Sequence, residues 1–424
     1  MSSFLVPMRP FYTLDISRLL SRAKALVPTG IDRVELEYAR YLLREAPERL
    51  EFAAMHPLGR FSAVPFSAAA EFIVSIGAFW DRGTSTETAV SRLAARLQSR
   101  ILMPKLARRD ARQPAASQAR VYLHVSHHHL VRPAVIETAI KRRPGTLFVP
   151  MVHDLIPLEY PEYSRPREPA RHKRRIDTVL RYADAILTPS RAVRASLERY
   201  VNLTDRENLP VWSVPHGVHL KAFESEVSAA EMRGEATEMP YFIYLSTIEA
   251  RKNHLLLLNI WRRLIETHGD TAPRLIIIGK RGWENEQVLD MLERCPALKG
   301  VVQEHNALSD TEVVRLLRGA RALLFPSFTE GFGLPLAEAL ALGTPVLCSD
   351  IPVFREIGGD VVRYIDPLDG LTWMRQIEAL SKKSVEEARS SVSTAPSLVV
   401  DWPNSVGMAL DHIESFAVQS HPGR

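Results

Sequence analysis

The chain has 424 residues, which exceeds what one ordinary hydrophobic core supports and predicts two domains of roughly 200 residues each. Hydrophobic residues make up 46% of the chain and charged residues 24%, the proportions of a soluble globular protein. A formal net charge of +5, with 54 basic residues, favours anionic partners such as nucleoside diphosphates, anionic lipid or nucleic acid.

The sequence lacks the usual signals for export, membrane insertion and metal binding. No apolar run reaches the ~18 residues of a membrane span. Residues 1–16 lack the early charges and the long apolar core of a signal peptide. Cys295 and Cys348 lie in apolar contexts without a CxxC pattern, which argues against a zinc site. We therefore expect a protein of the reducing cytoplasm.

The first elements of the chain are a strand, a glycine-bearing loop and a helix. The strand begins at Phe11, the loop covers residues 28–33 with Gly30 inside it, and an amphipathic helix runs from about Val34 to Leu43. The loop reads TGIDRV from Thr29 onward, and an ordinary βα loop is the alternative interpretation of its glycine.

Residues 88–120 form a basic cluster interleaved with apolar residues. Its cations are Arg92, Arg96, Arg100, Lys105, Arg108, Arg109, Arg112 and Arg120, against one acid, Asp110. The spacing 92, 96, 100 places three arginines on one helical face. A basic amphipathic helix can lie on an anionic membrane surface. The alternative is a solvated helix followed by a loose loop.

Histidines follow two predicted strands in the first half of the chain. Residues 121–125 form a strand that precedes His127–His129, and three adjacent histidines cannot all face one metal from a strand end. Residues 146–152 form a better strand, which leads into His153 and Asp154. The carboxyl end of a parallel strand is where α/β proteins bind ligands. A histidine that only caps a turn is the alternative.

A second basic cluster, residues 165–175, reads RPREPARHKRR and opens a helix that continues to Tyr182. Ser190 is placed to cap the next helix, residues 191–200. Residues 211–217, VWSVPHG, are expected to form the linker between two domains.

From residue 239 strands and helices alternate at the period of a parallel, doubly wound sheet. Arg251 and Lys252 follow the first strand of this region and open its first helix. Two cations beside a helix N-terminus can hold a diphosphate. A solvated helix face is the alternative. Further along, Asn306 and Leu308 precede a helix that Ser309 is expected to cap.

Residues 322–350 combine a buried strand, a glycine-rich loop, a short helix and a second strand. Pro335 suits a helix start and Gly343 a left-handed helix end. Glu330 belongs to the loop, and Glu338 lies about one turn into the helix. The N–H groups of residues 331–333 precede the helix, and this position predicts an anion site. The carboxylates of Glu330 and Glu338 can accept hydrogen bonds from hydroxyl groups. A sugar nucleotide presents both, although a buried segment with incidental glutamates is the alternative.

The string from Glu330 to Glu338, EGFGLPLAE, resembles the donor-site signature of retaining glycosyltransferases of family 4, which have the GT-B fold. This resemblance implies an α/β protein with two Rossmann-like, doubly wound domains that face a cleft. Residues 1–217, completed by a C-terminal helix over 402–420, would bind the acceptor. Residues 218–401 would bind the nucleotide-sugar donor.

The resemblance also implies roles for individual residues. His153 would face the transferred sugar, Arg251 and Lys252 would stabilise the diphosphate in place of a metal ion, and Glu330 would hold the donor sugar. Glu338 would accept hydrogen bonds from the ribose. The implied donor-binding positions are Gly30, Asp154, Asn306, Leu308, Gly331, Phe332, Gly333, Leu334 and Glu338.

Strings such as TGIDRV and HDLIP are similar to those of bacterial transferases that build O-antigen, capsule or exopolysaccharide. We therefore expect a retaining, metal-independent hexosyltransferase that needs no cofactor and no nucleic acid. GDP-mannose is the favoured donor, and a glycan or lipid-linked glycan at the inner membrane face is the expected acceptor. A UDP-sugar-dependent enzyme of the same fold and a non-catalytic nucleotide-sugar-binding module are the alternatives. A Rossmann oxidoreductase is disfavoured because no GxGxxG follows an early strand.

Overall fold

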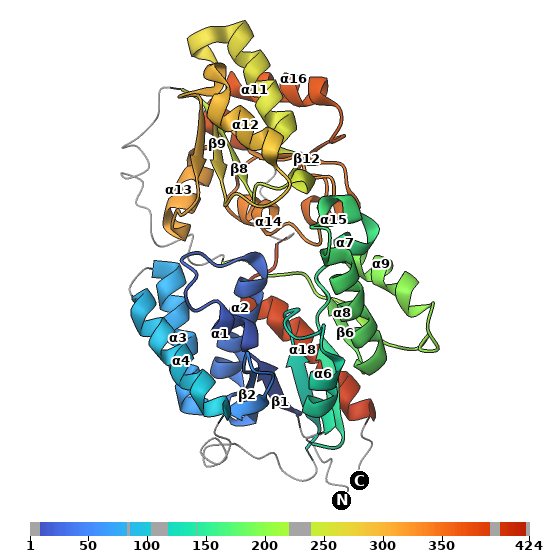
Figure 1. Ribbon diagram of the computed structural model, residues 1–424. Helices are drawn as coiled ribbons and strands as arrows, with labels where there is room; N and C mark the ends of the chain where they lie inside the picture. The colour runs from blue at the N-terminus through green and yellow to red at the C-terminus, as the bar shows by residue number, and fades with distance from the viewer. Residues whose placement is uncertain are drawn as a thin grey trace, which may run out of the picture. The chain divides into compact units, whose positions relative to one another are not determined.

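A computed structural model describes residues 9–82, 85–102, 118–141, 143–219, 239–390 and 399–420. These residues divide into two compact units. Unit 1 takes its residues from 1–158, 169–216 and 402–424, and unit 2 from 159–168 and 217–401 (Figure 1). The chain therefore passes from one unit to the other four times.

Unit 1 is built on a mostly parallel sheet. Its strands are β1 (Phe11–Asp15), β2 (Leu50–Met55), β3 (Phe61–Val64), β4 (Arg120–His124) and β5 (Thr146–Pro150), in the order β3-β2-β1-β4-β5. Only the pairing of β2 with β3 is antiparallel among these strands. A parallel pair, β6 (Ile186–Thr188) and β7 (Val211–Ser213), continues beyond β5 through a bridge from Met151 to Leu187. The strands are buried on both faces, as in parallel sheets covered by helices.

Helices cover both faces of the unit 1 sheet. They are α1 (Ser17–Ser21), α2 (Gly30–Glu45), α3 (Phe66–Arg82), α4 (Glu87–Leu102), α6 (Pro133–Lys141), α7 (Ile156–Glu159), α8 (Glu168–Tyr182), α9 (Arg191–Val201) and α18 (Trp402–Ser420). The predicted cap of α9 is confirmed, since the Ser190 hydroxyl accepts a hydrogen bond from the Val193 N–H at 3.1 Å.

The C-terminal helix α18 belongs to unit 1, where Figure 1 draws it in red. His412 stacks on Trp212, with ring centroids 5.4 Å apart and an interplanar angle of 9°. Glu414 accepts hydrogen bonds from Arg49 at 3.0 Å and from the Tyr12 hydroxyl at 3.2 Å. These contacts join residues about 200 to 400 positions apart.

Unit 2 contains a wholly parallel sheet within the described residues. Its strands are β8 (Tyr241–Leu245), β9 (Arg274–Ile278), β10 (Val302–His305), β11 (Leu323–Phe325), β12 (Val346–Ser349) and β13 (Arg363–Ile365), in the order β10-β9-β8-β11-β12-β13. This order reverses between β8 and β11, as in a doubly wound nucleotide-binding fold. The prediction of a parallel, doubly wound sheet is confirmed here.

The helices of unit 2 are α11 (His254–His268), α12 (Glu286–Arg294), α13 (Asp310–Gly319), α14 (Leu334–Ala341), α15 (Pro352–Gly358), α16 (Gly370–Ser381) and α17 (Val385–Ser390). Ser309 caps α13 in a capping box with Glu312. Gly343 has φ +67°, so the left-handed end predicted for α14 is confirmed. Local capping signals thus set the start of α13 and the end of α14.

The division into units differs from the predicted domains in one segment. Residues 159–168, which contain the short helix η3 (Pro161–Tyr163), belong to unit 2, whereas the sequence placed them in the first domain. The other crossings lie at 216/217 and 401/402, next to the predicted boundaries.

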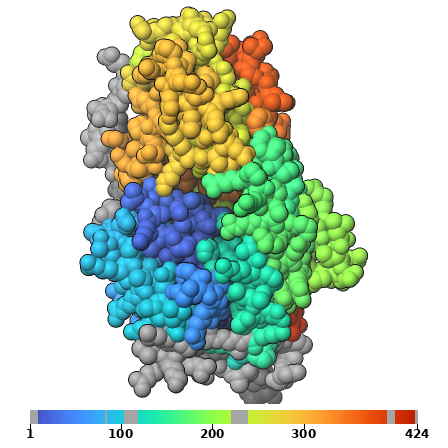
Figure 2. Space-filling model, in the orientation of Figure 1, coloured from blue at the N-terminus to red at the C-terminus, as the bar shows by residue number. Residues whose placement is uncertain are grey.

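Helix α4, for which the sequence left membrane contact and a solvated helix as alternatives, packs its apolar face inside unit 1. Val90, Ala94, Leu97 and Ile101 are buried, and α4 contacts α3, whose light-blue surface lies beside it in Figure 2. Arg92 and Arg96 remain exposed, while Lys105, Arg108, Arg109 and Arg112 lie outside the described residues. Arg120 begins strand β4 instead of extending the helix.

No helix in the described part of the chain combines the length and apolarity needed to cross a membrane.

Candidate functional site: ion pairs at the sheet switch point of unit 2

The candidate site of unit 2 lies where the strand order reverses. Strand β8 leads into the segment Thr247–Asn253, and β11 leads into the segment Phe328–Gly333. Both segments therefore begin at the carboxyl ends of neighbouring parallel strands. Open α/β sheets bind ligands at this position, because the connections on either side run in opposite directions and leave a crevice.

The first segment holds its two cations through a tight turn. Ala250–Lys252 forms a 3-10 turn, η5, and Asn253 follows in the left-handed region with φ 57°. The Asn253 amide nitrogen Nδ2 donates to the Pro367 carbonyl at 2.9 Å, and the buried Tyr244 hydroxyl donates to the Lys252 carbonyl. These bonds fix the backbone from which the Arg251 and Lys252 side chains extend.

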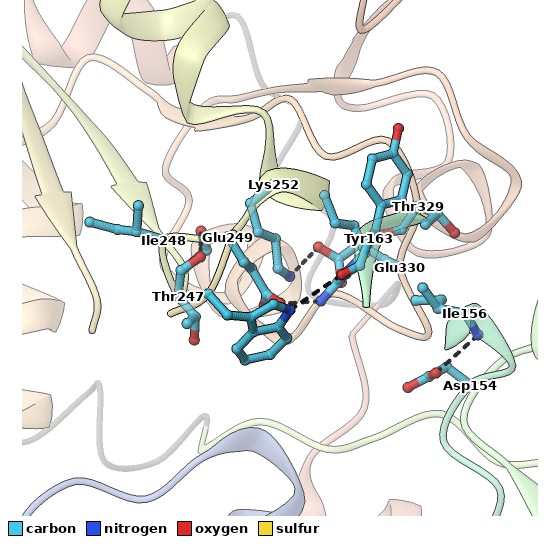
Figure 3. A network of polar contacts seen from close by, with 12 residues as sticks. Asp154, Ile156, Tyr163, Thr247, Ile248, Glu249, Lys252, Thr329 and Glu330 are labelled. Atoms are coloured by element: carbon cyan, nitrogen blue, oxygen red, sulfur yellow. Dashed lines mark hydrogen bonds and ion pairs between the residues drawn. The ribbon is translucent and has the colours of Figure 1, made fainter. Parts of the chain in front are cut away.

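Glu330 pairs with both cations (Figure 3). Arg251 Nη1 lies 2.7 Å from Glu330 Oε2, and Lys252 Nζ contacts Oε1. The Arg251 guanidinium also donates to the Thr329 carbonyl at 2.8 Å, while the Phe328 N–H donates to the Arg251 carbonyl at 3.0 Å. The side chains of Glu330 and Lys252 are 8% and 11% exposed, so water screens the pairs weakly.

The two cations hold the Glu330 pKa at about 2 although burial alone would raise it. Burial lowers the Lys252 pKa, and the neighbouring Arg251 adds to this effect, while Glu330 opposes it. Glu330 is therefore a carboxylate at neutral pH. The site thus holds two fixed cations side by side, and such groups can donate charge-assisted hydrogen bonds to a diphosphate.

Glu249 is a member of this site that the sequence analysis did not single out. Its Oε1 atom lies 3.3 Å from Arg251 Nη2, and its side chain is 7% exposed. Figure 3 places Glu249 beside Lys252, and the charge of Glu249 opposes the lowering of the Lys252 pKa. The string EARKN could have predicted this role, since Glu249 lies two positions before Arg251. An acid at that spacing can orient the guanidinium.

The turn Gly331–Gly333 precedes helix α14, as predicted. Gly333 is the N-cap with φ 111°, and a Cβ atom there would lie 2.9 Å from the Phe354 ring, so the position requires glycine. Pro335 occupies the first turn of α14. Glu338 is half-buried in the same helix, and Leu334 begins it.

Asn306 and Leu308 lie after β10, at the edge of the sheet away from the reversal point. Asn306 is exposed and Leu308 half-buried. Both residues lie in the loop that leads to the capped helix α13.

In unit 1, His153 and Asp154 follow strand β5 at the carboxyl edge of the sheet. His153 Nε2 lies 2.8 Å from the Val125 carbonyl, which can only accept, so Nε2 carries the proton and Nδ1 can accept a hydrogen bond. Burial lowers the His153 pKa to about 4. The Asp154 carboxylate accepts from the Ile156 N–H at 3.1 Å and so caps the turn into α7 (Figure 3).

Gly30 is the first residue of helix α2, and it is exposed. Thr29 is the N-cap, in a capping box with Asp32. Arg18, which the sequence analysis missed, donates to Asp32 at 2.6 Å, to Thr29 at 3.0 Å and contacts His127 at 3.2 Å. No local pattern links these positions, because more than a hundred residues separate Arg18 from His127.

Within the described ranges, no three His, Cys, Asp or Glu side chains come close enough together to hold a metal ion. His127–His129 form a turn after β4, and burial lowers the pKa of each. For His127, the nearby Arg18 guanidinium lowers the pKa further.

Residues 229–390 match the protein family described as Glycosyl transferases group 1. This match covers the ion-pair cluster and the turn before α14. The predicted relation to family 4 is compatible with it and is a finer assignment.

Curated relatives of this chain include mannosyltransferases of O-antigen synthesis. The chain is 28% identical over 254 residues to O-antigen chain mannosyltransferase B of Escherichia coli, a match that covers 59% of this chain and 66% of that protein. It is 30% identical over 250 residues to the serotype-specific mannosyltransferase WbdA of Escherichia coli, covering 56% of this chain and 30% of WbdA. The chain thus spans just under two thirds of the first relative and under a third of the second.

Solved structures with the same architecture cover nearly the whole chain. HepE from Anabaena, in complex with UDP, superimposes with a TM-score of 0.62 at 14% identity, over 96% of this chain and 100% of that one. Sucrose-phosphate synthase from Thermosynechococcus elongatus superimposes with a TM-score of 0.64 at 14% identity, over 97% of this chain and 100% of that one. The predicted GT-B fold is confirmed.

Proposed function

We propose that this protein is a retaining, metal-independent mannosyltransferase of cell-surface polysaccharide synthesis, and that GDP-mannose is its donor. The single observation that carries the proposal is the Arg251–Lys252–Glu330 cluster at the reversal point of the unit 2 sheet. The mannosyltransferase names of the curated relatives support the choice of sugar.

In this proposal the donor diphosphate lies against Arg251 and Lys252. The bond between the sugar C1 and the phosphate oxygen breaks, and negative charge builds on the leaving diphosphate. Two fixed cations in a poorly screened site stabilise that charge, and they do so most strongly in the transition state. The acceptor hydroxyl bonds to C1 on the same face, and its proton passes to the leaving phosphate oxygen. The anomeric configuration is thereby retained.

Glu330 and the amides of Gly331–Gly333 would hold the hydroxyls of the donor sugar. Glu330 keeps its charge because of the two cations, and a carboxylate is a strong acceptor for hydroxyl groups. His153 would present the neutral Nδ1 atom of its ring to a sugar hydroxyl, because its Nε2 proton is held by Val125. Both groups would thus bind hydroxyls without donating a proton to the reaction.

The proposed acceptor is a growing glycan, free or linked to a lipid, at the cytoplasmic face of the inner membrane. Exposed cations of unit 1 support contact with anionic lipid: Arg92 and Arg96 on α4, and Arg171, Lys173 and Arg174 on α8. Each cation near an anionic surface contributes about 1 kcal/mol. The contribution of α4 would be electrostatic only, since its apolar face is buried within unit 1.

A donor screen followed by a transfer assay tests the proposal. Thermal unfolding is measured with GDP-mannose, GDP, UDP-glucose and UDP, because a ligand at a hundred times its Kd stabilises by about 2.7 kcal/mol. Radiolabelled mannose transfer to a lipid-linked glycan is then measured with and without EDTA. We expect GDP-mannose to stabilise most and transfer to survive EDTA. Stabilisation only by UDP compounds would overturn the choice of donor. If the protein binds GDP-mannose but neither transfers nor hydrolyses its sugar, it is a non-catalytic binding module.

Replacing Glu338 with alanine tests the ribose contact. A hydrogen bond between a charged group and hydroxyls contributes roughly 1.5–3 kcal/mol, so GDP affinity should fall by about tenfold to a hundredfold. Calorimetric titration with GDP measures the change, and Glu356→Ala, on the neighbouring helix α15, is the control. Equal GDP affinity in wild type and Glu338→Ala would rule out the ribose contact.

A further inference from the structure

Residues Glu159–Glu168 belong to unit 2, although the chain on either side of them belongs to unit 1. The segment begins five positions after Asp154 and contains the short helix η3. Within ten residues it has two tyrosines, Tyr160 and Tyr163, and two arginines, Arg165 and Arg167, besides three glutamates. We call this segment the strap.

Tyr163 attaches the strap to the segment that carries Glu330. The Tyr163 ring stacks on the Phe328 ring, with centroids 5.6 Å apart and planes 4° from parallel. Tyr160 stacks on Tyr163, at 6.2 Å and 26°. Offset ring pairs of this kind have preferred geometries and resist sliding. Since Phe328 also donates its N–H to the Arg251 carbonyl, the stack ends at the backbone of the catalytic cluster.

Arg165 attaches the strap to a second loop, the one between β9 and α12. Its guanidinium lies 4.9 Å from the centroid of the Trp283 ring, and the Trp283 indole N–H donates to the Tyr163 carbonyl at 3.4 Å. A guanidinium over an indole face is an attractive cation–π contact.

The Trp283 loop is in turn fastened to the segment that carries Glu249. The Gly282 N–H donates to the Ile248 carbonyl at 2.9 Å, and the Asn285 side chain donates to the same carbonyl at 2.7 Å. A Cβ atom at Gly282 would lie 2.8 Å from that oxygen, so the close approach requires glycine. The strap therefore contacts two loops, and each of them is bonded to the backbone of the Thr247–Lys252 segment.

We propose that the strap is a positioning element that holds Phe328 and Trp283 together and thereby fixes Glu330 and Arg251 in the geometry needed for transfer. The inference rests on the proposed function, because the cluster it positions is the one assigned to the donor. The residues of the strap act through Phe328 and Trp283 and take no part in the chemistry. A displacement of about 1 Å at a reacting group can reduce turnover as much as a hundredfold, so small losses of order suffice.

The first test compares Tyr163→Ala with Tyr163→Phe in the full-length protein. The phenylalanine keeps the ring that stacks on Phe328, and the alanine removes it. We expect Tyr163→Ala to lower kcat/KM for GDP-mannose at least tenfold, mainly through kcat, with GDP affinity changed less than threefold. Tyr163→Phe should restore kcat/KM to within threefold of wild type. Equal kcat/KM in Tyr163→Ala and wild type would overturn the proposal.

The second test measures order in the Glu330 segment without using activity. Hydrogen exchange is followed by mass spectrometry for peptides covering residues 328–333. We expect faster exchange in Tyr163→Ala and in Arg165→Ala, and wild-type exchange in Arg167→Ala, which removes an exposed cation of the same strap. Because Arg165 is exposed, its variant should fold even if Tyr163→Ala does not. Unchanged exchange in Arg165→Ala and Tyr163→Ala would contradict the strap.

The two proposals can fail separately. If the wild-type protein transfers sugar but the strap variants retain wild-type kcat/KM and exchange, the strap fails and the proposed function stands. If the wild-type protein transfers no sugar, the proposed function fails, and the exchange data still decide whether the strap orders residues 328–333.

Discussion

The carboxyl edges of the two sheets place buried ionisable groups in opposite charge states. In unit 2, Glu330 keeps its charge, with a pKa of about 2, because Arg251 and Lys252 lie within hydrogen-bonding distance. In unit 1, burial lowers the His153 pKa to about 4 and raises the Glu35 pKa to about 8, so both groups are neutral at pH 7. Burial raises the pKa of both glutamates, and the two bonded cations of Glu330 make the difference.

The comparison indicates what each edge can bind. Two fixed cations, Arg251 and Lys252, can donate charge-assisted hydrogen bonds to a ligand such as a diphosphate. An edge with a neutral histidine that accepts at Nδ1 suits an uncharged ligand with hydroxyl groups. In the proposed function, the unit 2 edge binds the charged part of the donor.

The largest expected effect comes from removing a cation in unit 2. Lys252→Ala should lower kcat by roughly a hundredfold to a thousandfold, because one fixed group that stabilises developing charge contributes on that scale. The donor KM should change much less, since the charge on the phosphate grows in the transition state. Steady-state kinetics with GDP-mannose measures both constants. Arg262→Ala, an exposed cation on α11, is the matched control, and a variant of Lys252 with normal kcat would refute the role.

The next effect concerns the neutral acid of unit 1. Glu35 is fully buried, and Asp15 beside it adds to the rise in its pKa, while Arg18 opposes it. Glu35 contributes to the free energy of unfolding because it is protonated in the folded protein. This contribution is fully present below the unfolded pKa of 4.5 and is lost as pH rises through the folded pKa of about 8. Glu35→Gln mimics the protonated acid and should remove this loss, which is on the order of 3 kcal/mol at pH 7.

Urea unfolding of wild type and Glu35→Gln at pH 5 and pH 8 measures the Glu35 effect. The two proteins should be similar at pH 5, and the variant should be the more stable one at pH 8. Glu48→Gln, at an exposed position, is the control. A variant that is less stable than wild type at pH 8 would show that Glu35 is charged in the folded protein.

The smallest effect concerns the anion of unit 2. Glu330→Gln removes the charge that partly neutralises Arg251 and Lys252, so GDP should bind about fivefold more tightly, a change of about 1 kcal/mol. Sugar transfer should fall in the same variant, because a neutral amide binds sugar hydroxyls more weakly than a carboxylate. Calorimetry with GDP checks the first expectation. Weaker GDP binding would mean that Glu330 chiefly holds the two cations in place.

The sequence alone determined the local features of this protein. Ser190 and Ser309 cap their helices, Gly343 ends α14 in the left-handed region, and the strands of unit 2 follow the predicted alternation with helices. These outcomes depend on residues within a few positions of one another. The cluster residues could also be predicted from the strings EARKN and EGFGLPLAE. Their cations suit a diphosphate, and their carboxylates suit hydroxyl groups.

Only the tertiary structure decided which of these residues meet. Glu330 contacts Lys252 and Arg251 from 78 and 79 positions away, and Arg18 contacts His127 from 109 positions away. The basic run 165–175 is a single cluster in the sequence, yet Arg165 lies over the Trp283 ring in unit 2 and Arg175 is buried in unit 1. Charge and ring character are properties of a residue, whereas the partner that stabilises a buried charge or a ring depends on sheet order and chain crossing. Those are set by the packing of the whole fold.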